Sequence, residues 1–85
     1  MERRFWKSGP NRISSDEGWV QLHRVGLDLA FRDEKYHISS EMLVPPMSIG
    51  IYFSSSPAGR GPNSTEVREY LVAALDFAGY TADFV

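Results

Sequence analysis

Apolar and polar residues alternate along four runs between residues 19 and 53. The runs are WVQLHRV, LDLAFR, KYHISSEML and SIGIYF, and each places apolar side chains at every second position. A period of two is typical of a strand that buries one face. Pro45 and Pro46 end the third run, because proline lacks the backbone N–H that a strand ladder needs. The pattern therefore predicts a meander of four antiparallel strands.

The period changes to that of a helix after residue 64. Apolar residues now recur three and four positions apart in one stripe, which consists of Val67, Tyr70, Leu71, Ala74, Leu75 and Ala78. Asn63 or Ser64 is suited to cap the helix start, and Gly79 is suited to end it. The last residues, YTADFV, alternate again and predict a short strand at an edge. We expect an α+β fold of order β-β-β-β-α-β, with four or five antiparallel strands and one C-terminal helix on one face.

Residues 1–16 show no sustained period and are rich in charges and turn formers, so we expect a flexible basic N-terminal arm. Residues 17–85 are expected to form a single α+β domain, since 85 residues fall within the usual size of one domain. One helix covers only one face of a sheet. The other face is predicted to present a set of polar and aromatic side chains: Trp19, His23, Arg32, His37, Ser39 and Tyr52.

Composition narrows the function classes. The chain has no cysteine, which excludes disulfides, zinc–thiolate sites and thiol nucleophiles and favours a reducing compartment. No segment approaches the roughly 18 apolar residues that span a bilayer, so we expect a soluble, cytoplasmic protein without membrane contact. The net charge of −2 provides no general attraction for nucleic acid, but the last 25 residues carry Arg68 alone against Glu66, Glu69, Asp76 and Asp83.

The segment SSSPAGRGPNST joins the fourth run to the helix and places two glycines around Arg60. A phosphate-binding P-loop needs the pattern G-x-x-x-x-G-K-[ST], whereas this segment lacks the lysine and has a different glycine spacing. Pro62 also removes one backbone amide that a phosphate cradle would use. We therefore expect a flexible connector, in which Arg60 remains available to a partner.

Two histidines and two serines are the candidates for chemistry. His23 and His37 could ligate a metal together with Asp28 or Glu41, but both lie on outward faces, and in a meander the second strand separates them. Ser39, Ser40 and Glu41 beside His37 are ingredients of a hydrolase, yet no nucleophile-elbow motif is present. His37 and Ser40 also point to opposite faces of one strand. We expect no catalytic site, no metal site and no cofactor.

Two binding functions remain. The outward face, with Trp19, His23, Arg32 and His37, together with the basic arm, would suit a small nucleic-acid-binding module, in which bases stack on aromatic rings. Alternatively, the outward face, the C-terminal edge strand and the acidic helix surface would suit a protein partner. Within the second function, the partner could also be another copy of the chain, bound through the same face as a homodimer.

The segments YHISSEML, SIGIYFSSS and STEVREYLVAALDFAGYTADFV together resemble the small immunity proteins of bacterial polymorphic toxin systems, in particular the group catalogued as immunity protein 74. The resemblance covers residues 19–85. It rests on Ser40 and Glu41 at a strand end, on the helix that opens after Ser64, and on the final TADFV strand. The basic N-terminal arm and the VPPM segment have no counterpart in that pattern.

The resemblance implies a cytoplasmic protein without an enzymatic activity of its own. Such a protein would bind a cognate toxin and occlude the toxin's active site. Acidic side chains would serve a nuclease toxin by imitating substrate phosphate. On this hypothesis the partner-binding residues are Glu41, Tyr52, Arg60, Glu69 and Asp76, with Tyr52 and Arg60 as anchors. An alternative role for Glu41 is to cap backbone amides at the strand end.

Overall fold

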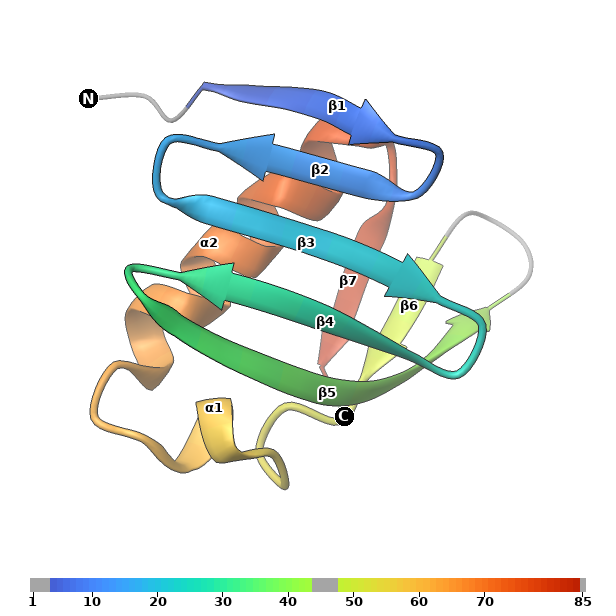
Figure 1. Ribbon diagram of the computed structural model, residues 1–85. Helices are drawn as coiled ribbons and strands as arrows, with labels where there is room; N and C mark the ends of the chain where they lie inside the picture. The colour runs from blue at the N-terminus through green and yellow to red at the C-terminus, as the bar shows by residue number, and fades with distance from the viewer. Residues whose placement is uncertain (1–3, 44–47, 85) are drawn as a thin grey trace.

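The computed structural model describes residues 4–43 and 48–84, which form a curled seven-stranded sheet with one long helix against it (Figure 1). The order of the strands in the sheet is their order in the chain, and neighbours are antiparallel except for the parallel last pair. The strands are β1 (Phe5–Gly9), β2 (Arg12–Ser15), β3 (Gly18–His23), β4 (Gly26–Phe31), β5 (Glu34–Leu43), β6 (Ser48–Ile51) and β7 (Thr81–Phe84). The helices are α1 (Pro57–Arg60) and α2 (Ser64–Phe77).

The α+β class, the strand meander and the edge position of the last strand are confirmed. The predicted number of four or five strands is wrong, and the sheet is mixed rather than antiparallel throughout. The prediction that Pro45 and Pro46 end a strand concerns residues outside those that the structure describes.

The prediction of a flexible arm over residues 1–16 does not hold for the described residues 4–16, because β1 and β2 form a hairpin there. Pro10 and Asn11 make its two-residue turn. The other edge of β2 pairs with β3, so the hairpin is part of the main sheet. The sequence of this hairpin shows no clear alternation of apolar residues, because Ile13 is the only fully buried side chain in the two strands. Phe5 adds a half-buried ring that packs on Tyr70 and Phe77.

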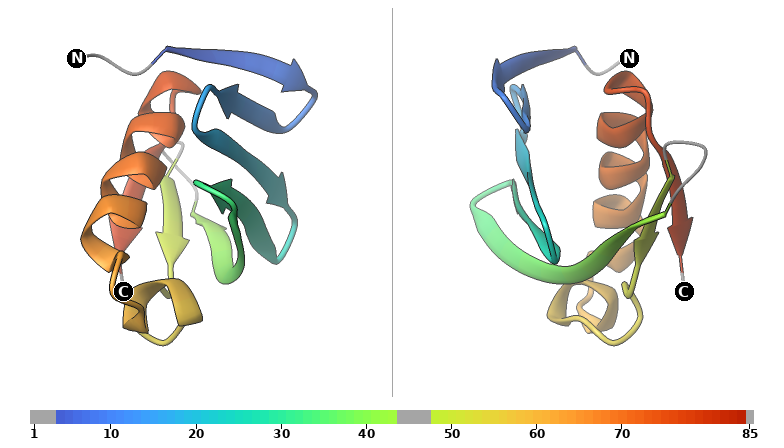
Figure 2. Two further views of the ribbon diagram at one scale, coloured as in Figure 1. Left: turned by 60° about the vertical axis from the view of Figure 1, so that its left-hand side comes forward. Right: turned by 90° about the vertical axis from the view of Figure 1, so that its right-hand side faces the viewer.

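The strand β5 bends and joins the two parts of the curled sheet (Figures 1 and 2). It pairs with β4 along its first half and with β6 along its second half. Beyond β6 the chain passes through α1 and α2 and returns as β7, parallel to β6, which is the crossover connection that parallel strands require. Figure 2 shows α2 on the concave side of the sheet, and no helix of the described residues lies on the convex side.

The core lies between α2 and the concave face. The predicted helical stripe is confirmed: Val67, Tyr70, Leu71, Ala74 and Leu75 are buried, and Ala78 is half-buried. The inward strand positions are confirmed in the same way, since Val20, Leu27, Leu29, Phe31, Ile38, Ile49, Ile51 and Phe53 are buried. Tyr70 is at the centre, with its ring 4.8 Å from that of Phe31 and its hydroxyl 2.6 Å from Ser15 Oγ.

The observed ends of α2 agree in part with the caps that the sequence predicts. Gly79 adopts φ +90°, and this left-handed conformation ends the helix as expected. Asn63 occupies the N-cap position, but its side chain makes no capping hydrogen bond. Instead, Ser56 caps the short helix α1, where its Oγ accepts a hydrogen bond from the Gly59 N–H at 3.2 Å.

Candidate functional site

An open groove runs between the outward side of α2 and the start of β7. Its volume is about 640 Å³, and it is lined by Thr65, Arg68, Glu69, Val72, Ala73, Asp76, Tyr80, Thr81 and Ala82. The helical residues in this set lie on the side of α2 opposite the buried stripe, at the same three- and four-residue spacing. Val72 is 41 % exposed there, which places an apolar side chain between two carboxylates, Glu69 and Asp76.

The strand β7 pairs with β6, and none of the described strands pairs with its other edge. Its side chains alternate: Ala82 and Phe84 are half-buried against the core, whereas Asp83 is exposed on the opposite, convex face. Thr81 is exposed at the start of the strand, where it lines the groove. An unpaired edge strand offers backbone N–H and C=O groups to another chain. The groove therefore has a free strand edge at its side.

Acidic side chains flank this strand on both faces. Glu69 and Asp76 line the groove on the helix side. On the convex face, the registers Glu41↔Gly50 and Gly50↔Asp83 place Glu41 and Asp83 in one row, with only a glycine between them. We call β7 together with Glu41, Glu69, Asp76 and Asp83 the acidic edge.

Arg68 is the one cation among the described residues that line the groove, and it is already engaged. The Arg68 guanidinium lies 4.5 Å from the centroid of the Phe84 ring, a cation–π arrangement. Phe84 in turn packs edge-on against Phe53 at 5.6 Å. Among the described residues, Glu69, Asp76 and Asp83 have no ion pair or side-chain hydrogen bond. The acidic edge thus presents carboxylates whose charge is not neutralised within the molecule.

The five predicted partner-binding residues do not form one cluster. Glu69 and Asp76 lie in the groove, and Arg60 is exposed on α1. Glu41 and Tyr52 meet on the convex side, where the Tyr52 hydroxyl donates a hydrogen bond to Glu41 Oε1 at 3.1 Å. This hydrogen bond and the neighbouring negative charge raise the pKa of the Tyr52 phenol. Glu41 therefore accepts a hydrogen bond from a side chain. Within the described contacts it does not cap backbone amides.

The convex face holds a hydrogen-bonded cluster of three residues on three neighbouring strands. Asp28 in β4 receives hydrogen bonds from both histidines, with 2.7 Å between Oδ2 and His23 Nε2 and 2.6 Å between Oδ1 and His37 Nδ1. The middle strand separates the histidines, as predicted, but its own carboxylate also links them. No group of three or more acidic or histidine side chains suited to a metal ion occurs in the described part of the chain.

The His23–Asp28–His37 cluster makes one contribution to stability depend on pH. The hydrogen bond from His37 is the main cause that lowers the pKa of the Asp28 carboxyl below its usual value. A lowered folded-state pKa stabilises the fold above the unfolded value of about 3.9, and this stabilisation disappears as the pH falls through the folded value. We expect Asp28→Asn to lower the free energy of unfolding at pH 7 by under about 1 kcal/mol, because the side chain is 39 % exposed.

The measurement is urea denaturation of both proteins between pH 7 and pH 2. The difference between Asp28→Asn and the unchanged protein is expected to narrow below about pH 4. Asp33→Asn is the matched control, since Asp33 lies in an exposed turn at φ 71°, a conformation that asparagine tolerates well. A difference that is constant over this pH range would contradict the assignment to the Asp28 charge.

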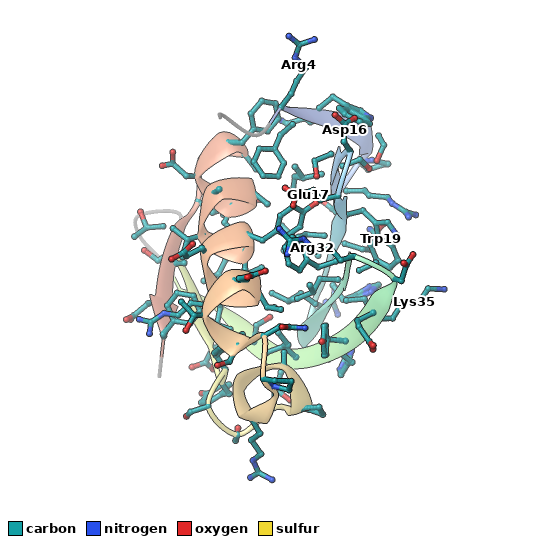
Figure 3. All side chains as sticks on the ribbon, turned by 90° about the vertical axis from the view of Figure 1, so that its left-hand side faces the viewer. Arg4, Asp16, Glu17, Trp19, Arg32 and Lys35 are labelled. Carbon is teal, nitrogen blue, oxygen red and sulfur yellow. The ribbon has the colours of Figure 1, made fainter. Side chains whose placement is uncertain are left out.

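The predicted stacking platform on the convex face is occupied in part by the protein itself. Trp19 is half-buried, and the Arg12 guanidinium lies 4.2 Å from its ring centroid. Arg32 is not on this face at all, contrary to the prediction: it belongs to the β4–β5 turn, with φ 49°. Figure 3 shows Arg32 near the helix, where it pairs with Glu17 at 3.3 Å and with Glu66 of α2 at 2.5 Å.

The segment that joins β6 to α2 is a structured connector. The residues 57–60 form α1, which sequence reasoning missed because a single turn has no visible period. A Cβ on Gly59 would lie 2.0 Å from the Phe53 carbonyl oxygen, so this glycine permits close packing of two backbone segments. Gly59, the first of the two glycines around Arg60, therefore has a packing role.

Ser40 and His37 point to opposite faces, as predicted. Ser40 is buried on the concave side, whereas His37 is exposed on the convex side and bound to Asp28. This separation leaves the predicted hydrolase ingredients without a shared site.

None of three comparisons with known proteins finds a match: no family model, no curated protein and no solved structure is similar to this chain. Within the described residues, no helix combines the length and the apolar character needed to cross a membrane.

Proposed function

We propose that this chain is a non-enzymatic protein-binding module whose partner docks on the acidic edge. The observation that carries the proposal is a free strand edge beside an open groove, with unneutralised carboxylates on both faces. Such an edge is an aggregation hazard unless it is protected or used, and a groove with a partly exposed valine between two carboxylates suits a specific partner.

The named version of this function is an immunity protein that neutralises a cognate bacterial toxin in the cytoplasm by occluding the toxin's active site. The acidic edge would meet the basic surface with which a nuclease toxin holds its substrate. Charge complementarity of this kind speeds the encounter and favours the correct partner. The proposal requires no reactive group on this chain.

A nucleic-acid-binding module is the alternative, and the contacts on the convex face support it less. Arg12 already stacks on Trp19, and Arg32 is paired with two glutamates away from that face. The two hypotheses differ in a simple measurement. A nucleic-acid-binding module binds oligonucleotides with an affinity that falls steeply with salt, whereas the toxin inhibitor binds a protein in nuclease-treated extract.

The proposal predicts that the double variant Glu69→Lys, Asp76→Lys binds the partner more weakly. The partner is purified first on the unchanged protein, and the affinity is then measured by calorimetry at low and at high salt. Reversing two exposed charges at the rim is expected to weaken binding at low salt by roughly tenfold or more. The affinity of the double variant should also depend less on ionic strength.

The matched control is the double variant Asp16→Lys, Glu34→Lys, which changes the net charge equally at two exposed carboxylates that do not line the groove and belong to neither α2 nor β7. It is expected to bind nearly as well as the unchanged protein. Equal weakening in the two double variants would mean that only net charge matters, and it would contradict a site at the acidic edge.

A further inference from the structure

We infer that the partner contributes an extended, basic segment that pairs with β7 as an additional strand of the sheet. This inference rests on the proposed function and specifies its binding mode. It follows from three features of the acidic edge: the free main chain of β7, the charge on its two faces and the shape of the groove.

The main chain of β7 is the first feature. Its four residues pair with β6 on one side, and no described strand lies on the other. None of the backbone hydrogen bonds outside the regular elements involves residues 81–84, so the free side of β7 is not capped by a described loop. An extended segment added there gains main-chain hydrogen bonds that are independent of its sequence.

The charge on the two faces selects the composition of that segment. Side chains of an added strand alternate between the two faces of the sheet. On the helix side they approach Glu69 and Asp76, and on the convex side they approach Asp83, with Glu41 further along the same row. Both alternating sets therefore meet carboxylates, which favours lysine or arginine on both faces of the segment.

The groove gives long basic side chains a place to lie. Its wall includes Val72, Ala73 and Ala82, against which the aliphatic part of a lysine or arginine packs while its charge reaches Glu69 or Asp76. The volume of about 640 Å³ leaves room for side chains of this length. An acidic or purely apolar segment would leave these carboxylates without a partner.

A second copy of this chain fits the edge less well. Two β7 strands related by a twofold axis would bring Asp83 and the groove carboxylates against their own counterparts, and like charges in an interface cost binding energy. Pairing of β7 with β1 of another copy would join molecules head to tail into an open chain, in contrast to the closed symmetry that most soluble oligomers adopt.

The experiment uses an isomeric pair of short peptides with the intact protein. The probe is acetyl-Lys-Val-Lys-Lys-Val-Lys-amide with its third and fourth residues methylated once on the side-chain nitrogen. Its isomer carries the two methyl groups on the backbone nitrogens of the same residues, which blocks both edges of the strand while charge and composition stay equal. A third peptide has glutamate in place of each lysine. Binding is followed by NMR titration of backbone amides.

We expect the side-chain-methylated peptide to shift the amides of residues 81–84 and to slow their hydrogen exchange. The backbone-methylated isomer should bind at least about tenfold more weakly, and the glutamate peptide should not bind. Val72→Arg should weaken binding of the side-chain-methylated peptide. Val25→Arg, the same change at an exposed valine in the β3–β4 turn, should leave that binding unchanged.

Three outcomes would overturn the inference. The two isomers could bind equally well, the shifts could be confined to β1 or the convex face, or none of the peptides could bind. Concentration-dependent dimers that protect residues 81–84 without peptide would overturn it in favour of a second copy. A protein partner that depends on Glu69 and Asp76 but leaves the edge of β7 unprotected would keep the proposed function and reject strand addition. The absence of any such partner would reject the proposed function itself.

Discussion

Tyr70→Ala is expected to destabilise the fold by about 3–5 kcal/mol, the usual cost of removing a large buried ring. Tyr70 has no exposed surface and is among the largest fully buried side chains. It joins parts of the chain that are far apart in sequence, because its ring packs against Phe5 of β1 and Phe31 of β4, and its hydroxyl is bonded to Ser15 of β2. Truncation leaves a cavity between α2 and the first four strands and removes the hydrogen bond between the Tyr70 and Ser15 hydroxyls.

A chain of 85 residues has a total stability of roughly 4–13 kcal/mol, so this loss removes a large part of it. Thermal unfolding followed by circular dichroism should show a fall in Tm of roughly 15–30 °C. Tyr52→Ala is the control, since it removes the same group from an exposed position and should cost about 0.5 kcal/mol or less. Similar losses for the two variants would mean that Tyr70 is not at the centre of the core.

Gly59→Ala is expected to have the second largest effect, roughly 1–3 kcal/mol or more. The new Cβ would lie 2.0 Å from the Phe53 carbonyl oxygen and 2.7 Å from its carbon, and both are backbone atoms that cannot rotate away. The helix α1 must therefore move away from Phe53, which follows the end of β6. That movement also disturbs Ala58, which is buried, and the Ser56 cap of α1.

Chemical denaturation of Gly59→Ala and Gly61→Ala separates this close contact from a general effect of glycine. Gly61 has φ −83°, which any residue adopts, and a Cβ there would approach the nearest atom at 3.3 Å. We expect Gly61→Ala to change the free energy of unfolding by less than about 1 kcal/mol, since alanine also reduces the entropy of the unfolded chain. A neutral Gly59→Ala would show that α1 does not pack closely on Phe53.

Residues with a strong local pattern were predictable. The helical stripe around Tyr70 and Leu71 and the alternating runs of β3 and β4 bury the side chains that their periods indicate. The hairpin of β1 and β2 was missed because its burial comes from contacts with distant residues, chiefly Phe5 on Tyr70 and Phe77. Such contacts leave no period in a short polar strand.

Turn chemistry explains the misplaced Arg32. The run LDLAFR suggests a strand that includes the arginine, but Arg32 and Asp33 both adopt positive φ and form the two-residue turn between β4 and β5. Neither residue is a glycine, so a left-handed conformation was not evident from the residue types. The side chain consequently faces Glu66 of the helix instead of the convex face.

The candidate site depended on strand register, which one sequence does not reveal. Glu69 and Asp76 were predicted from the charge of the helix surface, and the groove beside them is now visible. That Asp83 and Glu41 share a row across β7, β6 and β5 follows only from the observed pairing. The same holds for Asp28, whose place between two histidines required the register of three strands.

The central claim is that a protein partner binds at the acidic edge, and capture from nuclease-treated bacterial lysate tests it most directly. Three immobilised baits are compared: the unchanged protein, Val72→Arg in the groove, and Val25→Arg in the remote turn. We predict one stoichiometric protein partner on the unchanged protein and on Val25→Arg, and its loss from Val72→Arg. Equal capture by all three baits, or the loss of every partner on nuclease treatment, would contradict the account.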